Sequence, residues 1–333
     1  MDEILFEIRG VAGRIVLNRP QALNALTHGM ILALAAQLEA WAEDDAIERV
    51  VIEGAGDRAF CAGGDIRALY EAMGQGDAAY IDTFYRDEYH LNHRIHTYPK
   101  PYVAIIDGVV MGGGVGVSIH GSHRLVTEKA LFAMPETGIG FFPDVGGAWF
   151  LPRLPGEIGM YLGLTGTRLG PADALYCGVA THYVPRNRLA DSLDDLDAVT
   201  IDPGPASLAE RRDAIDRCFC GESVEAIIQA LQAEGDNWAG ETLEAMAGKS
   251  PISQKVAFRQ IREGADLVFT QAMALEFRLS QRFCAAPNFR EGIRAAVIDK
   301  DRNPQWRPAS LADVGEADVD AYFSPLAGDE LSL

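Results

Sequence analysis

The chain has 333 residues, of which 48% are hydrophobic and 23% are charged. This globular composition excludes a disordered protein and allows two domains, or one large domain with an appended subdomain. The 29 Lys and Arg against 48 Asp and Glu give a net charge of −19, which repels phosphate backbones and anionic lipid heads. We therefore expect neither nucleic acid nor a membrane surface as a partner.

The cysteines indicate a reducing compartment, and the N-terminal residues match no targeting pattern. The five cysteines are too scattered for a disulfide framework, and no C-x-x-C pair offers a zinc or redox site. Residues 1–5 carry neither a basic signal-peptide start nor an Arg-rich transit pattern. The apolar run from Tyr102 to Ile119 contains Asp107 and five glycines, so it suits a buried strand, loop and helix better than a membrane span. We expect a cytoplasmic protein.

Strands and helices alternate in the first part of the chain. Residues 4–8 and 14–18 are β-rich runs around a Gly-containing turn, which predicts a hairpin. Thr27 can cap a helix that runs to about Ala42. Residues 49–52 and 103–106 are typical of strands covered on both faces. This alternation predicts an α/β core with a substantially parallel sheet over residues 1–190.

The later part of the chain has a different character. Residues 185–207 are rich in Asp, Pro and Gly, which is typical of a linker. Residues 224–233 and 267–283 carry apolar residues at helical spacing, so residues 207–310 are predicted to form a C-terminal helical subdomain. Residues 311–333 are acidic with little periodicity, and we expect a loosely docked tail there.

Several familiar catalytic signatures are absent from the sequence. There is no P-loop, and the glycines of residues 112–116 do not match G-x-G-x-x-G. Ser118 lacks the second glycine of G-x-S-x-G, which argues against a serine hydrolase. His90, His93 and His96 would spread around a helix rather than converge on a metal ion. We therefore predict no metal site.

Two glycine-rich loops each follow a strand and precede a helical stretch. The first contains Gly63 and Gly64, and the second contains Gly112, Gly113 and Gly114. Glycines at the start of a helix expose backbone N–H groups at the positive end of the helix dipole, which suits an oxyanion. A tight turn with close helix packing is the alternative, and for one loop alone it is the more common one.

Two acids stand in an otherwise apolar, Gly- and Pro-rich segment, residues 134–147. Glu136 and Asp144 lie eight residues apart there. Carboxylates are costly to remove from water unless they are used or paired, so buried acids here would be functional ones. The alternative is a surface loop with two solvated acids.

Taken together, the two glycine loops and the Glu136 segment resemble the crotonase (enoyl-CoA hydratase/isomerase) superfamily across most of residues 1–190. The resemblance is strongest to its 3-hydroxyisobutyryl-CoA hydrolase branch, through residues 135–147, 150–154, 289–294, 298–301 and 304–306. It implies a crotonase-like β-β-α spiral core with a C-terminal helical extension. It also implies an acyl-CoA substrate, of which coenzyme A is a part, and no separate cofactor.

The resemblance assigns catalytic roles position by position. Gly64 and Gly113 match the residues whose N–H groups form the oxyanion hole for the thioester oxygen. Glu136 matches the catalytic carboxylate, which would either attack the thioester carbonyl or activate a water molecule. Asp144 matches the second acid of the hydrolase branch, and we expect it to hold the 3-hydroxyl of the substrate and to tune Glu136.

Further positions match substrate contacts or depart from the family. Glu88 matches an acid that lines the substrate pocket, and Gly64, Asp65, Ile66 and Arg67 match the strip that contacts coenzyme A. These matches complete the set of expected substrate-binding residues.

One departure separates the hydrolases from the hydratases. Gly116 stands where hydratases carry their other catalytic glutamate, so water addition across a double bond is in doubt. We therefore expect an acyl-CoA thioester hydrolase that acts on 3-hydroxyisobutyryl-CoA in valine breakdown. The alternatives are an enoyl-CoA isomerase or hydratase that uses Glu136 alone, and a non-catalytic CoA-binding protein. Crotonase relatives commonly form trimers or dimers of trimers, so a homotrimer or hexamer is expected unless the C-terminal extension replaces those contacts.

Overall fold

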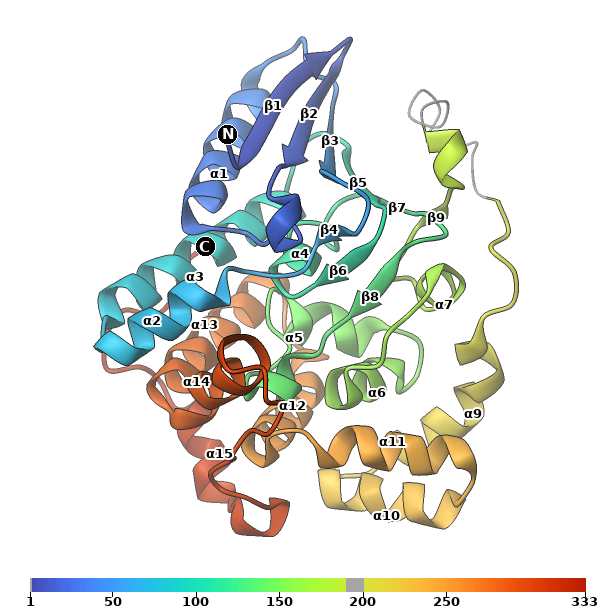
Figure 1. Ribbon diagram of the computed structural model, residues 1–333, viewed down its shortest axis with the longest axis vertical. Coiled ribbons are helices and arrows are strands. Elements are labelled where there is room, and N and C mark those ends of the chain that lie inside the picture. The colour runs from blue at the N-terminus through green and yellow to red at the C-terminus, as the bar shows by residue number, and fades with distance from the viewer. Residues whose placement is uncertain (1, 190–200) are drawn as a thin grey trace. The chain divides into compact units, whose positions relative to one another are not determined.

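The computed structural model describes residues 2–189 and 201–333 (Figure 1). These residues divide into two units. The first unit comprises the residues up to Asp65 together with His90–Ala133 and Arg168–Glu210. The second comprises Ile66–Tyr89, Met134–Thr167 and Arg211–Leu333. Each unit is thus assembled from three stretches of the chain. The predicted domain order, a core at residues 1–190, a helical subdomain at 207–310 and a tail at 311–333, stays a prediction. Residues 190–200 of the predicted linker lie outside the described residues.

Two sheets form the framework of the first unit. The six-stranded sheet has the order β1-β2-β3-β5-β7-β9, in which β1 and β2 form the predicted antiparallel hairpin and all other neighbours are parallel. The three-stranded sheet has the order β4-β6-β8 and is parallel throughout. The strands are β1 Ile4–Arg9, β2 Ala12–Leu17, β3 Arg49–Gly54, β4 Ala59–Cys61, β5 Tyr102–Ile106, β6 Val109–Met111, β7 His123–Val126, β8 Leu131–Ala133 and β9 His182–Tyr183.

Helices pack around these sheets as the sequence pattern requires. The hydroxyl of Thr27 accepts the N–H of Met30 at 3.3 Å and caps α1, His28–Glu43, as predicted. Every residue of β5 is buried, which explains its continuous apolar sequence. The unit also contains α4 Gly113–Gly116 and α7 Pro171–Tyr176. The predicted α/β core with a largely parallel sheet is confirmed.

The second unit is mainly helical. Two of its helices, α10 and α13, confirm the helical spacing read from residues 224–233 and 267–283. The helices that lie wholly in this unit are α2 Ile66–Gln75, α5 Gly147–Phe150, α6 Ile158–Thr165, α10 Val224–Glu234, α11 Asn237–Ala247, α12 Pro251–Gly264, α13 Phe269–Ala285, α14 Pro287–Ile293 and α15 Glu316–Phe323. Two further helices, α3 Ala78–His96 and α9 Ser207–Phe219, have residues in both units.

The C-terminal residues pack more closely than the sequence suggested. Val319, Phe323 and Leu331 are buried, and the ammonium group of Lys255 donates to the carbonyl oxygen of Val314 at 2.9 Å. The expectation of a loosely docked tail at residues 311–333 is therefore wrong. A helix of eight residues is too short for its apolar periodicity to stand out in an acidic segment.

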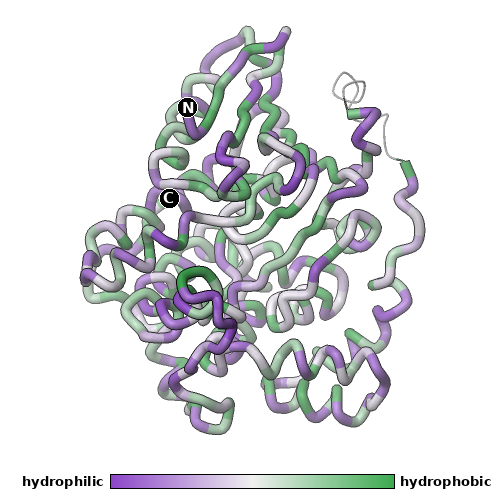
Figure 2. The backbone as a smooth tube through the Cα atoms, viewed as in Figure 1, coloured by the Kyte–Doolittle hydropathy of each residue, from purple (hydrophilic) through white to green (hydrophobic). Residues whose placement is uncertain are grey.

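Hydropathy follows this architecture. Figure 2 shows hydrophobic residues along the strands of the first unit, and helices on which hydrophobic and hydrophilic residues alternate.

In the second unit, Phe141 stacks on Phe289 with ring centroids 4.3 Å apart, and Phe142 stacks on Phe283 at 5.4 Å. These contacts fix the segment before Asp144 against α13 and α14. Among the described residues, no helix has both the length and the apolar character needed to cross a bilayer.

Candidate active site

The two glycine loops lie side by side in the first unit. They follow β4 and β6, which are parallel neighbours and so end at the same edge of their sheet. A Cβ added at Gly63 would lie 3.6 Å from the carbonyl oxygen of Met111 and 4.0 Å from the Cα atom of Gly112. A Cβ added at Gly114 would collide with the carbonyl oxygen of Cys61, so only glycine fits there.

The local backbone structure determines which acceptors the N–H groups of Gly64 and Gly113 can reach. Leu26 forms a parallel bridge to Gly64, donating its N–H to Gly63 at 2.9 Å and accepting from Asp65 at 2.8 Å. The residue between such a bonded pair turns its own N–H away from the partner strand. Gly113 is the first residue of α4, where an N–H has no acceptor within the helix. Among the described residues, neither N–H donates a backbone hydrogen bond outside the regular elements. Their role as an oxyanion hole stays a prediction.

The residues predicted to contact coenzyme A fall in both units. In the first unit, the carboxylate of Asp65 forms an ion pair with Arg19 at 3.0 Å. In the second, Ile66 begins α2, and the guanidinium of Arg67 donates to the carbonyl oxygen of Val297 at 3.0 Å. These bonds fix the side chains at either end of the strip, whose contact with coenzyme A stays a prediction.

The two predicted catalytic acids are both buried. Glu136 begins the short 3₁₀ helix η2, Glu136–Ile139, and is 5% exposed, while Asp144 is 6% exposed. Between them, Gly140 has φ +73°, and a Cβ there would collide with the carbonyl oxygen of Asn288. The loop is thus pressed against the start of α14, and the alternative of two solvated acids on a surface loop is excluded.

Asp144 and Glu88 come together in the second unit. The hydroxyl of Tyr89 donates to Oδ2 of Asp144 at 3.2 Å, and Glu88 precedes Tyr89 on α3. Burial raises the pKa of Asp144 to about 7, against the opposing effect of the Tyr89 hydrogen bond. Burial, and then the charges of Asp144 and Glu276, raise the pKa of Glu88 well above its usual range. The structure thus groups two of the predicted site acids in surroundings that favour their protonated forms.

A fourth buried acid, Glu276, was not found from the sequence. It lies on α13 with no exposed surface, and its two carboxylate oxygens accept the N–H groups of Gly146 and Ala148, both at 2.7 Å. Burial raises its pKa well above the usual range, and the two N–H donors oppose this rise. The signal in the sequence is its helical position, since Met273 and Phe283 share its face of the helix and are both fully buried.

The turn that carries Asp144 has a strained backbone. Val145 has φ +52°, which is rare for a β-branched residue, and Gly146 has φ +94°. Such a conformation costs about 1–3 kcal/mol and persists only where the surroundings hold it. Besides Glu276, the side-chain amide of Gln260 holds the turn by donating to the carbonyl oxygen of Pro143 at 2.7 Å. Strain of this kind is common at functional sites.

Cys284 lies beside the same acids but is poorly suited to nucleophilic attack. Its thiol shares a hydrogen bond with Tyr85, and burial raises its pKa to about 12. Because the thiolate is the nucleophile, such a thiol is largely inert at neutral pH. Cys284 also lines a cavity of about 620 Å³ together with Tyr70, Arg290 and Arg307.

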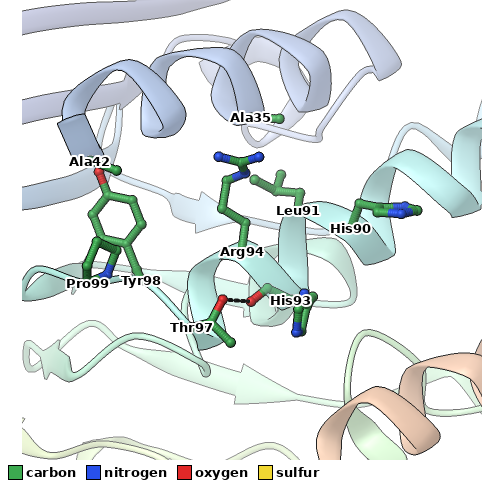
Figure 3. Close-up of a pocket in the computed structure, with 9 residues that line it drawn as sticks. All are labelled: Ala35, Ala42, His90, Leu91, His93, Arg94, Thr97, Tyr98 and Pro99. Atoms are coloured by element: carbon green, nitrogen blue, oxygen red, sulfur yellow. Dashed lines mark hydrogen bonds between the residues drawn. The ribbon is translucent and has the colours of Figure 1, made fainter. Parts of the chain in front are cut away.

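A separate cavity lies on the first unit and contains none of the predicted site residues. It has a volume of about 310 Å³ and lies between residues of α1 and the C-terminal part of α3. In Figure 3, His90 and His93 point in different directions, while Arg94 points toward α1. Within residues 2–189 and 201–333, no group of three His, Cys, Asp or Glu is placed to hold a metal ion.

The chain is similar over nearly its whole length to proteins described as "3-hydroxyisobutyryl-CoA hydrolase, mitochondrial". The relative from Danio rerio is 48% identical, over 99% of this chain and 92% of its own. The relative from Homo sapiens is 43% identical, over 100% of this chain and 91% of its own. The predicted cytoplasmic location is contradicted by these names and is wrong. Its basis was weak, because reduced cysteines and the first five residues do not distinguish one reducing compartment from another.

Solved structures and a family description agree on the fold. A structure titled as a carnitinyl-CoA dehydratase from Mycobacterium thermoresistibile matches with a TM-score of 0.95 and 43% identity, covering 100% of this chain and 99% of its own. One titled as an enoyl-CoA hydratase from Rhodobacter sphaeroides 2.4.1 matches with a TM-score of 0.94 and 40% identity, covering 100% of both chains. The family model described as "Enoyl-CoA hydratase/isomerase" matches residues 12–323. The chain therefore belongs to the enoyl-CoA hydratase/isomerase family and has the crotonase fold expected from its sequence.

Proposed function

We propose that the protein is an acyl-CoA thioester hydrolase whose substrate is 3-hydroxyisobutyryl-CoA, an intermediate of valine breakdown. The observation that carries this proposal is the similarity, at 43–48% identity over nearly the full length, to proteins named for that activity. The buried acids Asp144 and Glu88 give the similarity a chemical basis, because a buried carboxyl group can bind a substrate hydroxyl without competition from bulk water.

A hydratase is the main alternative, since one of the similar solved structures carries that title. Hydration by the two-glutamate route needs a second carboxylate after the oxyanion glycine. In this chain that position is Gly116, which is buried within α4 and has no side chain to supply. This feature favours the hydrolase over the hydratase.

The proposed reaction transfers the acyl group from sulfur to water. Water or the carboxylate of Glu136 attacks the thioester carbonyl carbon, and the N–H groups of Gly64 and Gly113 donate to the oxygen as it gains negative charge. One such donor typically contributes ~10²–10³ in rate. The carbon–sulfur bond then breaks, coenzyme A leaves as its thiolate and takes up a proton, and the hydroxy acid is released.

Glu136 has two possible roles in this scheme. As a general base it takes a proton from the attacking water, and as a nucleophile it forms a mixed anhydride that water then cleaves. Both routes need its ionised form and end in the same products. Neither requires a metal ion or a redox cofactor, so we propose that coenzyme A enters only as part of the substrate.

Asp144 and Glu88 would bind the part of the acyl group that distinguishes this substrate. With a pKa of about 7, Asp144 exchanges its proton near neutral pH and can either donate a hydrogen bond to the 3-hydroxyl or accept one from it. Residues Gly64 to Arg67 would contact coenzyme A. We also propose that the chain assembles as a homotrimer or hexamer, as crotonase relatives commonly do.

Incubation of the protein with 3-hydroxyisobutyryl-CoA and a thiol reagent tests the proposal. We expect release of free coenzyme A from this substrate, far faster than hydration of crotonyl-CoA followed in parallel. Hydration that outpaces thiol release would move the assignment to the hydratase alternative. Inertness toward both compounds, in a protein that still binds coenzyme A, would indicate a non-catalytic CoA-binding protein.

A further inference from the structure

Glu276 is a buried acidic group that the proposed reaction does not use. It lies in the middle of α13, fully buried, and its carboxylate contacts the backbone of a turn 130 residues earlier in the chain. Removing a carboxylate from water is costly unless hydrogen bonds replace its hydration. An apolar residue at this position of the helix would avoid that cost, so the placement of Glu276 calls for a role.

We propose that Glu276 is a positioning residue that acts through Asp144, by holding the backbone turn at Gly146 and Ala148 so that the Asp144 side chain stays directed at the substrate's 3-hydroxyl. This inference rests on the proposed function for its substrate. The contact between Glu276 and the turn stands on the geometry alone.

The geometry of the turn supports this role. The N–H of Gly147 donates to the carbonyl oxygen of Asp144 at 2.9 Å, which closes the turn locally. The N–H groups on either side of it, those of Gly146 and Ala148, point outward and are each accepted by one oxygen of Glu276. A single rigid carboxylate thus fixes two donors of one turn, and the direction of the Asp144 side chain depends on that turn.

The strained conformation of Val145 makes this support necessary. With φ +52° at a β-branched residue, the turn would relax toward a more favourable backbone if its donors lost their acceptor. Such a relaxation would rotate the peptide next to Asp144 and weaken the 3.2 Å hydrogen bond from Tyr89. After the loss of Glu276, the turn would keep the hydrogen bond from the side chain of Gln260 to the carbonyl oxygen of Pro143.

The substitution Glu276→Gln tests the proposal with little change of shape. Glutamine keeps one acceptor, but its amide group places N–H donors against a backbone N–H, so one of the two bonds is lost. We expect kcat/KM for 3-hydroxyisobutyryl-CoA to fall about 100-fold, the scale of a catalytic group misplaced by about 1 Å. The loss for isobutyryl-CoA, which lacks the 3-hydroxyl, should be much smaller.

Ser280→Ala is the matched control. Ser280 is fully buried one turn further along α13, and its hydroxyl donates only to the carbonyl oxygen of Phe277 at 2.8 Å among the bonds of the described residues. Its loss perturbs the same helix without touching the turn, so the preference for the hydroxylated substrate should stay unchanged.

The decisive measurement is a double-mutant cycle with Asp144→Asn, since residues that act as one unit are not additive. In the Asp144→Asn background, Glu276→Gln should change the ratio of the two substrates less than twofold. Equal losses on both substrates, or full additivity with Asp144→Asn, would overturn the proposal and leave Glu276 a purely structural acid.

Amide hydrogen exchange separates this proposal from the proposed function. Exchange at residues 144–148 should quicken in Glu276→Gln and stay unchanged in Ser280→Ala. Absence of coenzyme A release from the unaltered protein would overturn the proposed function instead, and the exchange rates would still decide whether Glu276 holds the turn. Unchanged exchange in a folded Glu276→Gln protein would refute the inference whatever the activity.

Discussion

Replacing Asp144 by Asn should cost activity and increase stability, with a pH dependence that identifies the cause. The carboxyl of Asp144 has an ordinary pKa of 3.8 and a folded-state pKa of about 7, raised chiefly by burial. The native state therefore holds the proton more tightly than the unfolded chain does. Between about pH 4 and pH 7 the native state binds this proton and the unfolded chain does not. Raising the pH over this range therefore favours the unfolded chain and lowers the free energy of unfolding.

The size of this effect follows from the two values. The gap between them corresponds to about 4 kcal/mol once pH exceeds 7, since each pKa unit is worth about 1.4 kcal/mol. About 2 kcal/mol of this loss should appear between pH 5.5 and 8.5. Asparagine carries no charge to bury and can still accept the Tyr89 hydrogen bond. The Asp144→Asn protein should therefore not show this decrease in the free energy of unfolding between pH 5.5 and 8.5.

Thermal unfolding of both proteins between pH 5.5 and 8.5 measures the difference. At about 2 °C per kcal/mol for a chain of this size, the Tm of Asp144→Asn should gain roughly 4 °C on the unaltered protein across that range. Asp57→Asn, which removes an exposed carboxylate, should follow the unaltered protein. A Tm difference between Asp144→Asn and the unaltered protein that is constant with pH would refute the assignment of a buried, proton-binding carboxyl at this position.

Three further predictions concern the reaction itself. The Gly113→Pro protein should fold, because proline is favoured at the first residue of a helix. Its turnover should fall at least ~10²-fold, because proline has no N–H to donate to the oxyanion. Near-normal turnover would eliminate Gly113 as an oxyanion donor. Free coenzyme A should raise the Tm, and the rise should be larger at low salt. On a chain of net charge −19 this anion has to bind beside local positive groups, whose attraction salt screens. A Tm that coenzyme A leaves unchanged at every salt level would contradict the binding strip at Gly64 to Arg67. Glu136→Gln should nearly abolish thioester cleavage while leaving the stabilisation by coenzyme A intact, and retention of most of the cleavage would show that another group attacks the carbonyl.

The sequence predicted the elements whose signals are local. The β1–β2 hairpin, the Thr27 cap and the buried strands β3 and β5 follow from alternation, capping chemistry and short apolar runs. The acids Glu136 and Asp144 were found because each stands among apolar neighbours in the chain, and both are buried in the structure.

What the sequence could not predict depends on contacts between distant residues. Glu276 interrupts the apolar face of its helix, but its partners, the N–H groups of Gly146 and Ala148, lie 130 and 128 residues away in the sequence. The burial of Val319, Phe323 and Leu331 in the C-terminal segment has the same origin, since so short a helix shows little apolar period in the sequence. The three stretches that make up each unit have no local signal in the sequence either, because they are separated along the chain.

The bond between Glu276 and the turn at Gly146 also sets an order of events during synthesis. The two partners are 130 residues apart, so at ~5–20 residues per second the turn leaves the ribosome roughly 7–26 s before its anchor. During that interval Phe142 lacks its partner Phe283 on α13 as well. The nascent chain therefore presents a turn without its anchor and an unpaired aromatic surface together, and exposed hydrophobic surface of this kind promotes aggregation. Slower translation of the segment before α13 should lengthen this exposure, and it should lower the soluble yield more than an equal pause placed after α13.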